Sequence, residues 1–245
     1  MTEFSRRVLL QTTAAFGTLA GLGSFAVAQR SDGKNHYRFF TADEARFVEA
    51  AVDRLIPSEP EWPGARDAGV PNYIDLQLAG PYGAGDRLFL GGPVRRGTPQ
   101  QGYQLGLTPA ELYRRALAAL GDLTARQGTA FHHRSPEQQD ELLKQIEINE
   151  IDLNGVPAPV FFETLLANTV EGYFADPAYG GNRDMVSWRM IGFPGAYAAY
   201  LGVYTQHGIM YDRPPISMAD AQRIHGTHDA APSSGTTHWH PRRKE

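Results

Sequence analysis

The chain contains no cysteine. This absence excludes disulfide bonds, thiolate zinc sites, iron–sulfur clusters and the Cys-x-x-Cys-His attachment of haem c within the chain. A basic surplus is also missing, because 23 lysine and arginine residues stand against 27 aspartate and glutamate residues, for a net charge of −4. Nucleic acid is therefore excluded as a partner, since a surface that binds it would show clustered positive charge.

Long apolar stretches and catalytic signatures are absent as well. Beyond residue 28, no stretch reaches the eighteen or more apolar residues that a membrane-spanning helix requires, so membrane association would come only through partners. The chain has no His-Glu-x-x-His, Gly-x-Ser-x-Gly, phosphate-binding-loop or protein-kinase motif. A pocket could still gather acid and base groups from separate segments. The candidates are His132, His133, Glu163, Glu171, Asp176 and Asp184.

The N-terminus has the features of an export signal. Arg6 and Arg7 precede an apolar run over residues 8–27, and Ala28 closes a small-residue cleavage site. We predict a twin-arginine signal peptide over residues 1–28, cleaved after Ala28, and therefore a periplasmic protein. An N-terminal membrane helix is the less favoured alternative, because three glycines within the run weaken both its hydrophobicity and its helix propensity.

Three helix starts are marked by capping boxes, at Thr41, Thr108 and Ser135. In each, a Ser or Thr side chain and the Glu or Gln three residues later exchange hydrogen bonds with each other's backbone amide. Apolar residues recur at helical spacing after each start, and a very apolar segment over residues 160–174 has the pattern of a central bundle helix. Shorter helices are expected over residues 71–79 and 196–204.

These patterns predict an all-α protein, an irregular helical bundle with long Gly/Pro-rich loops and an extended C-terminal arm. Eight glycines and three prolines over residues 80–106 predict a long irregular loop that packs on the body or on a partner. We place one helical domain at residues 29–205, since the length suits a single core. Residues 206–245 are expected to be an extended or disordered tail with solvated histidines.

Residues 171–195 combine turn-forming and aromatic residues. Asp176-Pro177 and Gly180-Gly181-Asn182 are turn sequences, because glycine and asparagine accept positive φ and proline fixes φ. A shaped loop at the end of a rigid helix is a common place for recognition, so we predict a partner interface here. Its candidate residues are Asp176, Tyr179, Asn182, Arg183, Trp188 and Arg189. In the alternative, the loop packs back on its own domain and Asp176 pairs with Arg183.

Two blocks of this loop, residues 172–184 and 188–195, resemble the signature of the gluconate 2-dehydrogenase subunit 3 family. A looser resemblance covers residues 39–204, including Leu55-Ile56-Pro57 and Gly69-Val70-Pro71. Members of that family are the small subunits of membrane-bound, FAD-dependent sugar and polyol dehydrogenases. The resemblance implies a subunit without a redox cofactor, partnered with an FAD-bearing large subunit and often with a haem c subunit.

The export signal and the resemblance point to the same role. The twin-arginine route carries folded proteins, so a signal on a chain without a cofactor site fits the export of a cofactor-loaded partner bound to it. The leading hypothesis is a non-catalytic subunit that supports folding, stability and export of a flavoprotein, which oxidises gluconate or a related sugar or polyol. Two alternatives stay open: a periplasmic enzyme with an unrecognised active site, and a stand-alone module that binds a small ligand.

Overall fold

The computed structural model describes residues 37–88, 90–92, 97–98, 104–197, 202, 205–210, 213–226 and 242–243. The predicted signal peptide lies outside the described residues, as does most of the helix expected over residues 196–204. The elements in chain order are α2 (Ala42–Leu55), α3 (Val70–Leu78), α4 (Pro81–Ala84), α5 (Pro109–Arg126), η2 (Phe131–His133), α6 (Pro136–Glu147), α7 (Ala158–Phe174), η3 (Pro177–Tyr179), η4 (Arg183–Met185), α8 (Val186–Ile191), β1 (Ile209–Met210), α9 (Met218–Gly226) and β2 (Arg242–Arg243).

All three predicted capping boxes form. At the start of α2, the Glu44 amide donates to Thr41 Oγ1 at 3.4 Å, and the Thr41 amide donates to Glu44 Oε2 at 2.8 Å. Thr108 and Ser135 open α5 and α6 with the same reciprocal pair of bonds. A side-chain cap of this kind stabilises a helix by roughly 1 kcal/mol. Local sequence therefore determines where three of the long helices begin.

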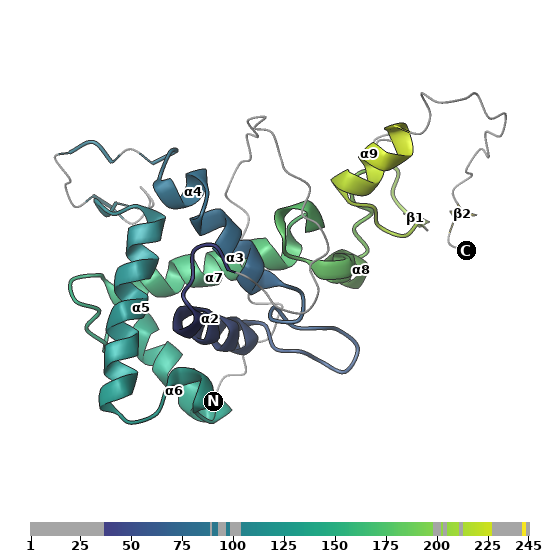
Figure 1. Cartoon of the computed structure of the whole chain (residues 1–245). Helices are drawn as coiled ribbons and strands as arrows, with labels where there is room; N and C mark the ends of the chain where they lie inside the picture. The colour runs from purple at the N-terminus through teal and green to yellow at the C-terminus, as the bar shows by residue number, and fades with distance from the viewer. Residues whose placement is uncertain are drawn as a thin grey trace.

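The protein is an all-α bundle in which α7 is central, as its apolar sequence predicted. This helix contacts α2, α3, α5, α6 and α8, and Figure 1 shows it crossing the middle of the molecule. The core gathers where these helices meet. Its largest fully buried side chains include Ile74, Leu112, Tyr113, Leu120, Phe131, Ile146, Phe161, Leu165 and Tyr173.

Two expectations differ from the structure in detail. The Gly/Pro-rich stretch after Gly80 begins with the short helix α4, because Pro81 occupies a first-turn position where its missing amide hydrogen costs nothing. The expected C-terminal arm includes α9, and β1 and β2 form a two-residue antiparallel pair. Among the described residues, no helix combines the length and the apolar character that crossing a membrane requires.

Candidate functional site

The predicted interface loop leaves the end of α7, forms the turns η3 and η4, and continues into α8. Asp176 begins it: Oδ1 accepts from the Ala178 amide at 2.9 Å, and Oδ2 accepts from the Met218 amide at the start of α9 at 2.7 Å. The Arg183 guanidinium donates instead to the Asp67 carbonyl, at 3.4 Å. The pairing of Asp176 with Arg183, which the alternative interpretation included, is therefore wrong, because the carboxylate accepts from two backbone amides and the guanidinium donates to a carbonyl.

Asn182 is fully buried and holds the loop from within. Its Nδ2 donates to the Ala175 carbonyl at 2.9 Å. Its Oδ1 accepts from both the amide and the hydroxyl of Ser187, at 3.0 and 2.9 Å. The side chain thus ties the end of α7 to the first turn of α8, and it has no surface to offer a partner.

The backbone around η4 is strained. Asn182, Asp184 and Met185 have φ of 43°, 56° and 54°, in the left-handed region that side chains disfavour. Asn and Asp tolerate this region, whereas Met185 does so at a cost on the order of 1 kcal/mol or more. The Arg183 amide donates to the Ala68 carbonyl at 2.8 Å and fixes the turn against the segment before α3. Strain maintained by surrounding contacts is typical of sites whose shape matters for function.

Two glycines let this loop lie directly on the helices beneath it. Gly180 has φ of 92°, and its carbonyl accepts from Asn72 Nδ2 of α3 at 3.0 Å. A Cβ at Gly181 would overlap the carbonyl oxygen of Gly172 in α7. The loop is consequently a close-packed part of the bundle, as the alternative interpretation expected.

Trp188 anchors α8. The side chain is buried, Nε1 donates to the Phe174 carbonyl at 2.8 Å, and the Phe193 ring packs edge-on against the indole at 5.0 Å. Its neighbour Arg189 is exposed and donates to the Asp184 carbonyl. One side of this short helix therefore faces the core and the other faces solvent.

The six predicted interface residues divide into two groups. Asp176, Asn182 and Trp188 lie inside the loop and shape it. Arg183 and Arg189 are exposed, and Tyr179 is half-buried. Only the second group offers side-chain surface to another molecule.

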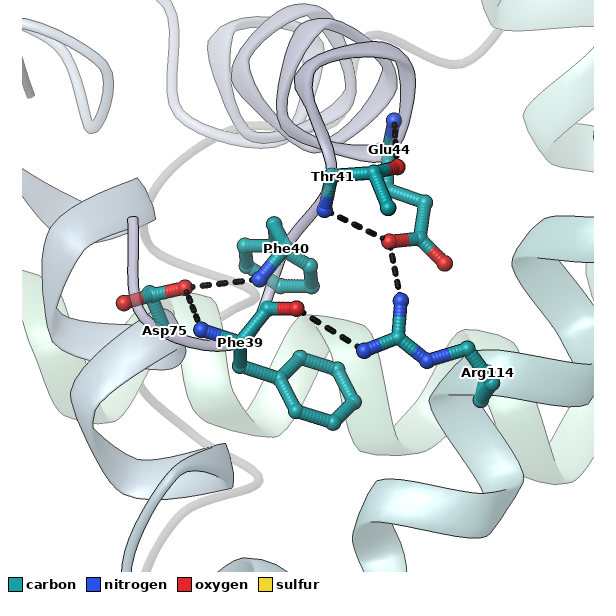
Figure 2. Close-up of polar contacts among 6 residues, drawn as sticks. All are labelled: Phe39, Phe40, Thr41, Glu44, Asp75 and Arg114. Atoms are coloured by element: carbon teal, nitrogen blue, oxygen red, sulfur yellow. Dashed lines mark hydrogen bonds and ion pairs between the residues drawn. The ribbon is translucent and has the colours of Figure 1, made fainter. Parts of the chain in front are cut away.

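A second polar centre, which sequence reasoning missed, fixes the N-terminal end of the body. The buried carboxylate of Asp75 accepts from the amides of Arg38, Phe39 and Phe40 at 2.7, 2.8 and 2.9 Å. Figure 2 shows Asp75 reaching from α3 to this segment. We call these contacts the N-terminal clamp. An aspartate directly after Ile74, on the buried side of a helix, was the sequence signal that could have indicated it.

Arg114 of α5 supports the same segment from the other side. Its guanidinium donates to the Phe39 carbonyl at 2.8 Å, pairs with Glu44 and lies 4.1 Å from the centre of the Phe39 ring. Figure 2 shows Arg114 between Phe39 and the first turn of α2. Residues 38–40, directly before α2, are therefore fixed by both α3 and α5.

A cluster of hydroxyl and carboxyl groups surrounds the buried Asn168 of α7. Asn168 accepts from the Tyr113 hydroxyl at 2.9 Å, and its Nδ2 donates to the Tyr82 hydroxyl at 3.2 Å. Burial raises the pKa of Tyr82 and of Tyr113. Desolvation of the carboxyl group likewise raises the pKa of Glu171, although the residue as a whole is exposed. The hydrogen bond that Asn168 Nδ2 donates to this carboxylate at 3.4 Å opposes the shift. Tyrosines of this kind keep their protons and act as structural donors.

The other acid–base candidates lie apart from this cluster. His132 and His133 lie in η2 with ring centres 4.1 Å apart. The pKa of His132 is lowered mainly by burial and secondly by the neighbouring His133. Glu163 is exposed on the surface of α7. Within the described part of the chain, no group of three His, Cys, Asp or Glu side chains could hold a metal ion.

A hollow of about 210 Å³ lies beside Arg183 and is lined also by Arg66 and Asp67.

A family model described as gluconate 2-dehydrogenase subunit 3 matches residues 42–195. The matched range begins with α2 and ends at Gly195, so it includes the bundle and the whole interface loop. Neither a curated protein nor a solved structure matches the chain.

Proposed function

Because the chain belongs to the gluconate 2-dehydrogenase subunit 3 family, we propose that it is the non-catalytic small subunit of a heteromeric, FAD-dependent dehydrogenase. The complex oxidises gluconate or a related sugar, sugar acid or polyol. FAD, and haem c where a cytochrome subunit is present, belong to the partner subunits. This chain supports folding, stability and export of the flavoprotein subunit.

The family match over residues 42–195 carries the proposal. It spans the helices that hold the interface loop as well as the loop itself, so the match concerns the helical bundle together with its loop. A protein of this family is one subunit of a multi-subunit complex, which requires a surface for partner binding.

The construction of the loop supports a recognition role. Asn182 and Trp188 form hydrogen bonds through their side-chain polar atoms to groups of the same chain, and the strained turn at Asp184 and Met185 is held in one shape. A surface fixed before binding loses little conformational entropy when a partner docks. Rigid elements carrying a shaped loop are therefore suited to a protein–protein contact.

The export part of the proposal rests on Arg6 and Arg7. In the proposal, the flavoprotein folds around its cofactor in the cytoplasm, binds this chain and is carried by its signal to the periplasm. The mature complex then works at the periplasmic face of the inner membrane, to which partner subunits attach it.

Affinity purification tests the partnership. A C-terminally tagged chain is purified from producing cells, and bound flavin and gluconate-dependent reduction of an acceptor dye are measured. We expect a flavoprotein to copurify in a fixed ratio and to carry the activity. Oxidation of gluconate by the isolated chain, or purification of the chain alone, would overturn the proposal.

Replacement of the twin arginine tests export. Arg6→Lys together with Arg7→Lys is expected to leave the flavoprotein and its activity in the cytoplasmic fraction, and Arg30→Lys is the matched control outside the pair. The measurement is dehydrogenase activity in the two fractions. Unchanged periplasmic activity in the double variant would contradict the export role.

A further inference from the structure

Five large apolar side chains are exposed among the described residues, and three of them belong to the end of the interface loop and the start of α9. Ile191 is 53% exposed, Phe193 43% and Met218 40%. Of the other two, Tyr82 at 37% lies within α4 and Ile148 at 52% directly follows α6. Figure 1 places α8 and α9 together at one end of the molecule, away from α6, which precedes Ile148. Single exposed apolar residues are ordinary, whereas a group of them marks an interaction site.

Backbone bonds connect the two segments that carry these side chains. The Ala196 amide donates to the Ile216 carbonyl at 2.9 Å, and the Ile216 amide donates to the Pro194 carbonyl at 3.2 Å. The Met218 amide is held by Asp176 at 2.7 Å. Phe193 therefore lies directly before this short stretch of paired backbone and Met218 soon after it, and Ile191 ends α8 two residues before Phe193. We call Ile191, Phe193 and Met218 the apolar face.

The apolar face rests on a firm base. Phe193 packs on the buried Trp188, whose Nε1 is bonded to the end of α7. A Cβ at Gly195 would overlap the Ile216 carbonyl, so the two segments approach as closely as glycine allows. The backbone that carries these exposed side chains is therefore bonded to the rest of the bundle.

Charge beside the apolar face indicates the chemistry of what covers it. Arg189 is exposed on α8, and its guanidinium donates to a neutral carbonyl, that of Asp184. No carboxylate among the described residues forms an ion pair with it. Protein interfaces are enriched in aromatic residues, Met and Arg relative to the rest of the surface, and a polar rim surrounds their apolar centre.

We propose that the apolar face is where the flavoprotein subunit docks, placing an apolar recess over Phe193 and a carboxylate beside Arg189. The inference rests on the proposed function, which requires a protein partner, and adds which surface binds it. Asp176, Asn182 and Trp188 do not touch the flavoprotein and act by holding the apolar face in position. A stable interface covers roughly 800 Å² on each partner, so these side chains form its centre and the neighbouring surface its rim.

The chain offers a closely matched control for a substitution test. Ile191 and Ile148 are the same residue type, are exposed to 53% and 52%, and each lies at the C-terminal end of a helix. Ile191→Ser, Met218→Ser and Ile148→Ser are each produced as tagged full chains together with the flavoprotein. Bound flavin per chain is measured after affinity purification, and the dissociation constant by titration with purified flavoprotein.

We expect Ile191→Ser and Met218→Ser each to weaken binding about tenfold or more, as loss of a central apolar contact does, and Ile148→Ser to leave it within about twofold. Thermal unfolding of each isolated variant shows whether the fold is kept. Phe193→Ser is a less clean test because it also removes a contact with Trp188. Arg189→Glu is expected to slow association and to reduce its dependence on salt.

The outcomes separate the inference from the proposed function. If the wild-type chain retains flavoprotein and all serine variants retain it equally, the apolar face is not the interface, while the proposed function stands. If the wild-type chain retains no flavoprotein, both fail. If the apolar-face variants instead change the sedimentation of the isolated chain, the face binds a second copy of this chain and the docking inference is refuted.

Discussion

The N-terminal clamp makes a quantitative prediction about one side chain. Asp75→Ala removes the acceptor of three backbone amides, at 2.7, 2.8 and 2.9 Å, and leaves space of the same shape. The Phe40 amide is buried, whereas those of Arg38 and Phe39 are partly accessible to water. The cost therefore differs among the three donors.

A buried amide left without an acceptor costs about 1–3 kcal/mol, and a partly hydrated one costs less because water replaces the lost acceptor. When the costs for the three donors are added, Asp75→Ala is expected to lower the free energy of unfolding by about 2–5 kcal/mol. Asp75→Asn is expected to cost less. Its amide oxygen can keep the bonds from Phe39 and Phe40, but its NH₂ group would face the Arg38 donor.

Denaturant unfolding followed by circular dichroism measures these differences, and Asp122→Ala, which removes an exposed carboxylate from α5, is the control. Trypsin adds a local measurement, because cleavage after Arg38 requires this segment to leave the clamp. A loss of about 2 kcal/mol would increase cleavage there about thirtyfold when opening is fast. If Asp75→Ala and Asp122→Ala agree within about 0.5 kcal/mol, water satisfies these amides as well as the carboxylate does, and the reasoning fails.

Two further predictions concern α7 and its surroundings. Burial raises the pKa of Glu171, so the folded chain holds this proton to a higher pH than the unfolded chain does, and stability falls as pH rises above the ordinary pKa of glutamate. Glu171→Gln should therefore raise Tm at about pH 7 but not at about pH 4, and an equal change at both would contradict this. Gly172→Ala should lower stability by about 1–3 kcal/mol, because its Cβ would lie 2.6 Å from the Tyr73 ring. Gly121→Ala in open space on α5 should raise stability by about 0.5–1 kcal/mol, and equal denaturant midpoints for the two variants would refute the packing argument.

Sequence predicted those parts of the fold that local interactions determine. Thr41, Thr108 and Ser135 each mark a helix start because the capping partners lie three residues apart. Helix α9 went unpredicted although Ser217 and Asp220 form a similar reciprocal cap, with the Asp220 amide 3.1 Å from Ser217 Oγ. The apolar pattern that follows it is weak, so the cap alone did not distinguish a helix from a polar tail.

Burial within the interface loop could not be predicted from sequence. Polar residues such as Asp176 and Asn182 are usually exposed in loops, and only tertiary contacts showed that backbone groups surround them. Apolar residues such as Ile191 and Met218 are usually assigned to a core, and here they are exposed. An irregular loop has no periodicity that separates its buried side from its exposed side, so sequence alone does not distinguish the two kinds of residue.

Two buried aspartates extend the folded unit beyond the region that the family model matches. Asp75 binds amides before residue 42, and Asp176 binds the Met218 amide after residue 195. A carboxylate that accepts from backbone amides fixes the position of the attached backbone but does not require particular side chains there. The flanking sequence therefore gives little indication that the segment is attached. Asp176 also sets the position of Met218 on the apolar face. Sequence analysis predicted that Asp176 touches the partner. In the docking proposal Asp176 instead influences partner binding from inside the subunit, because it holds the backbone of Met218.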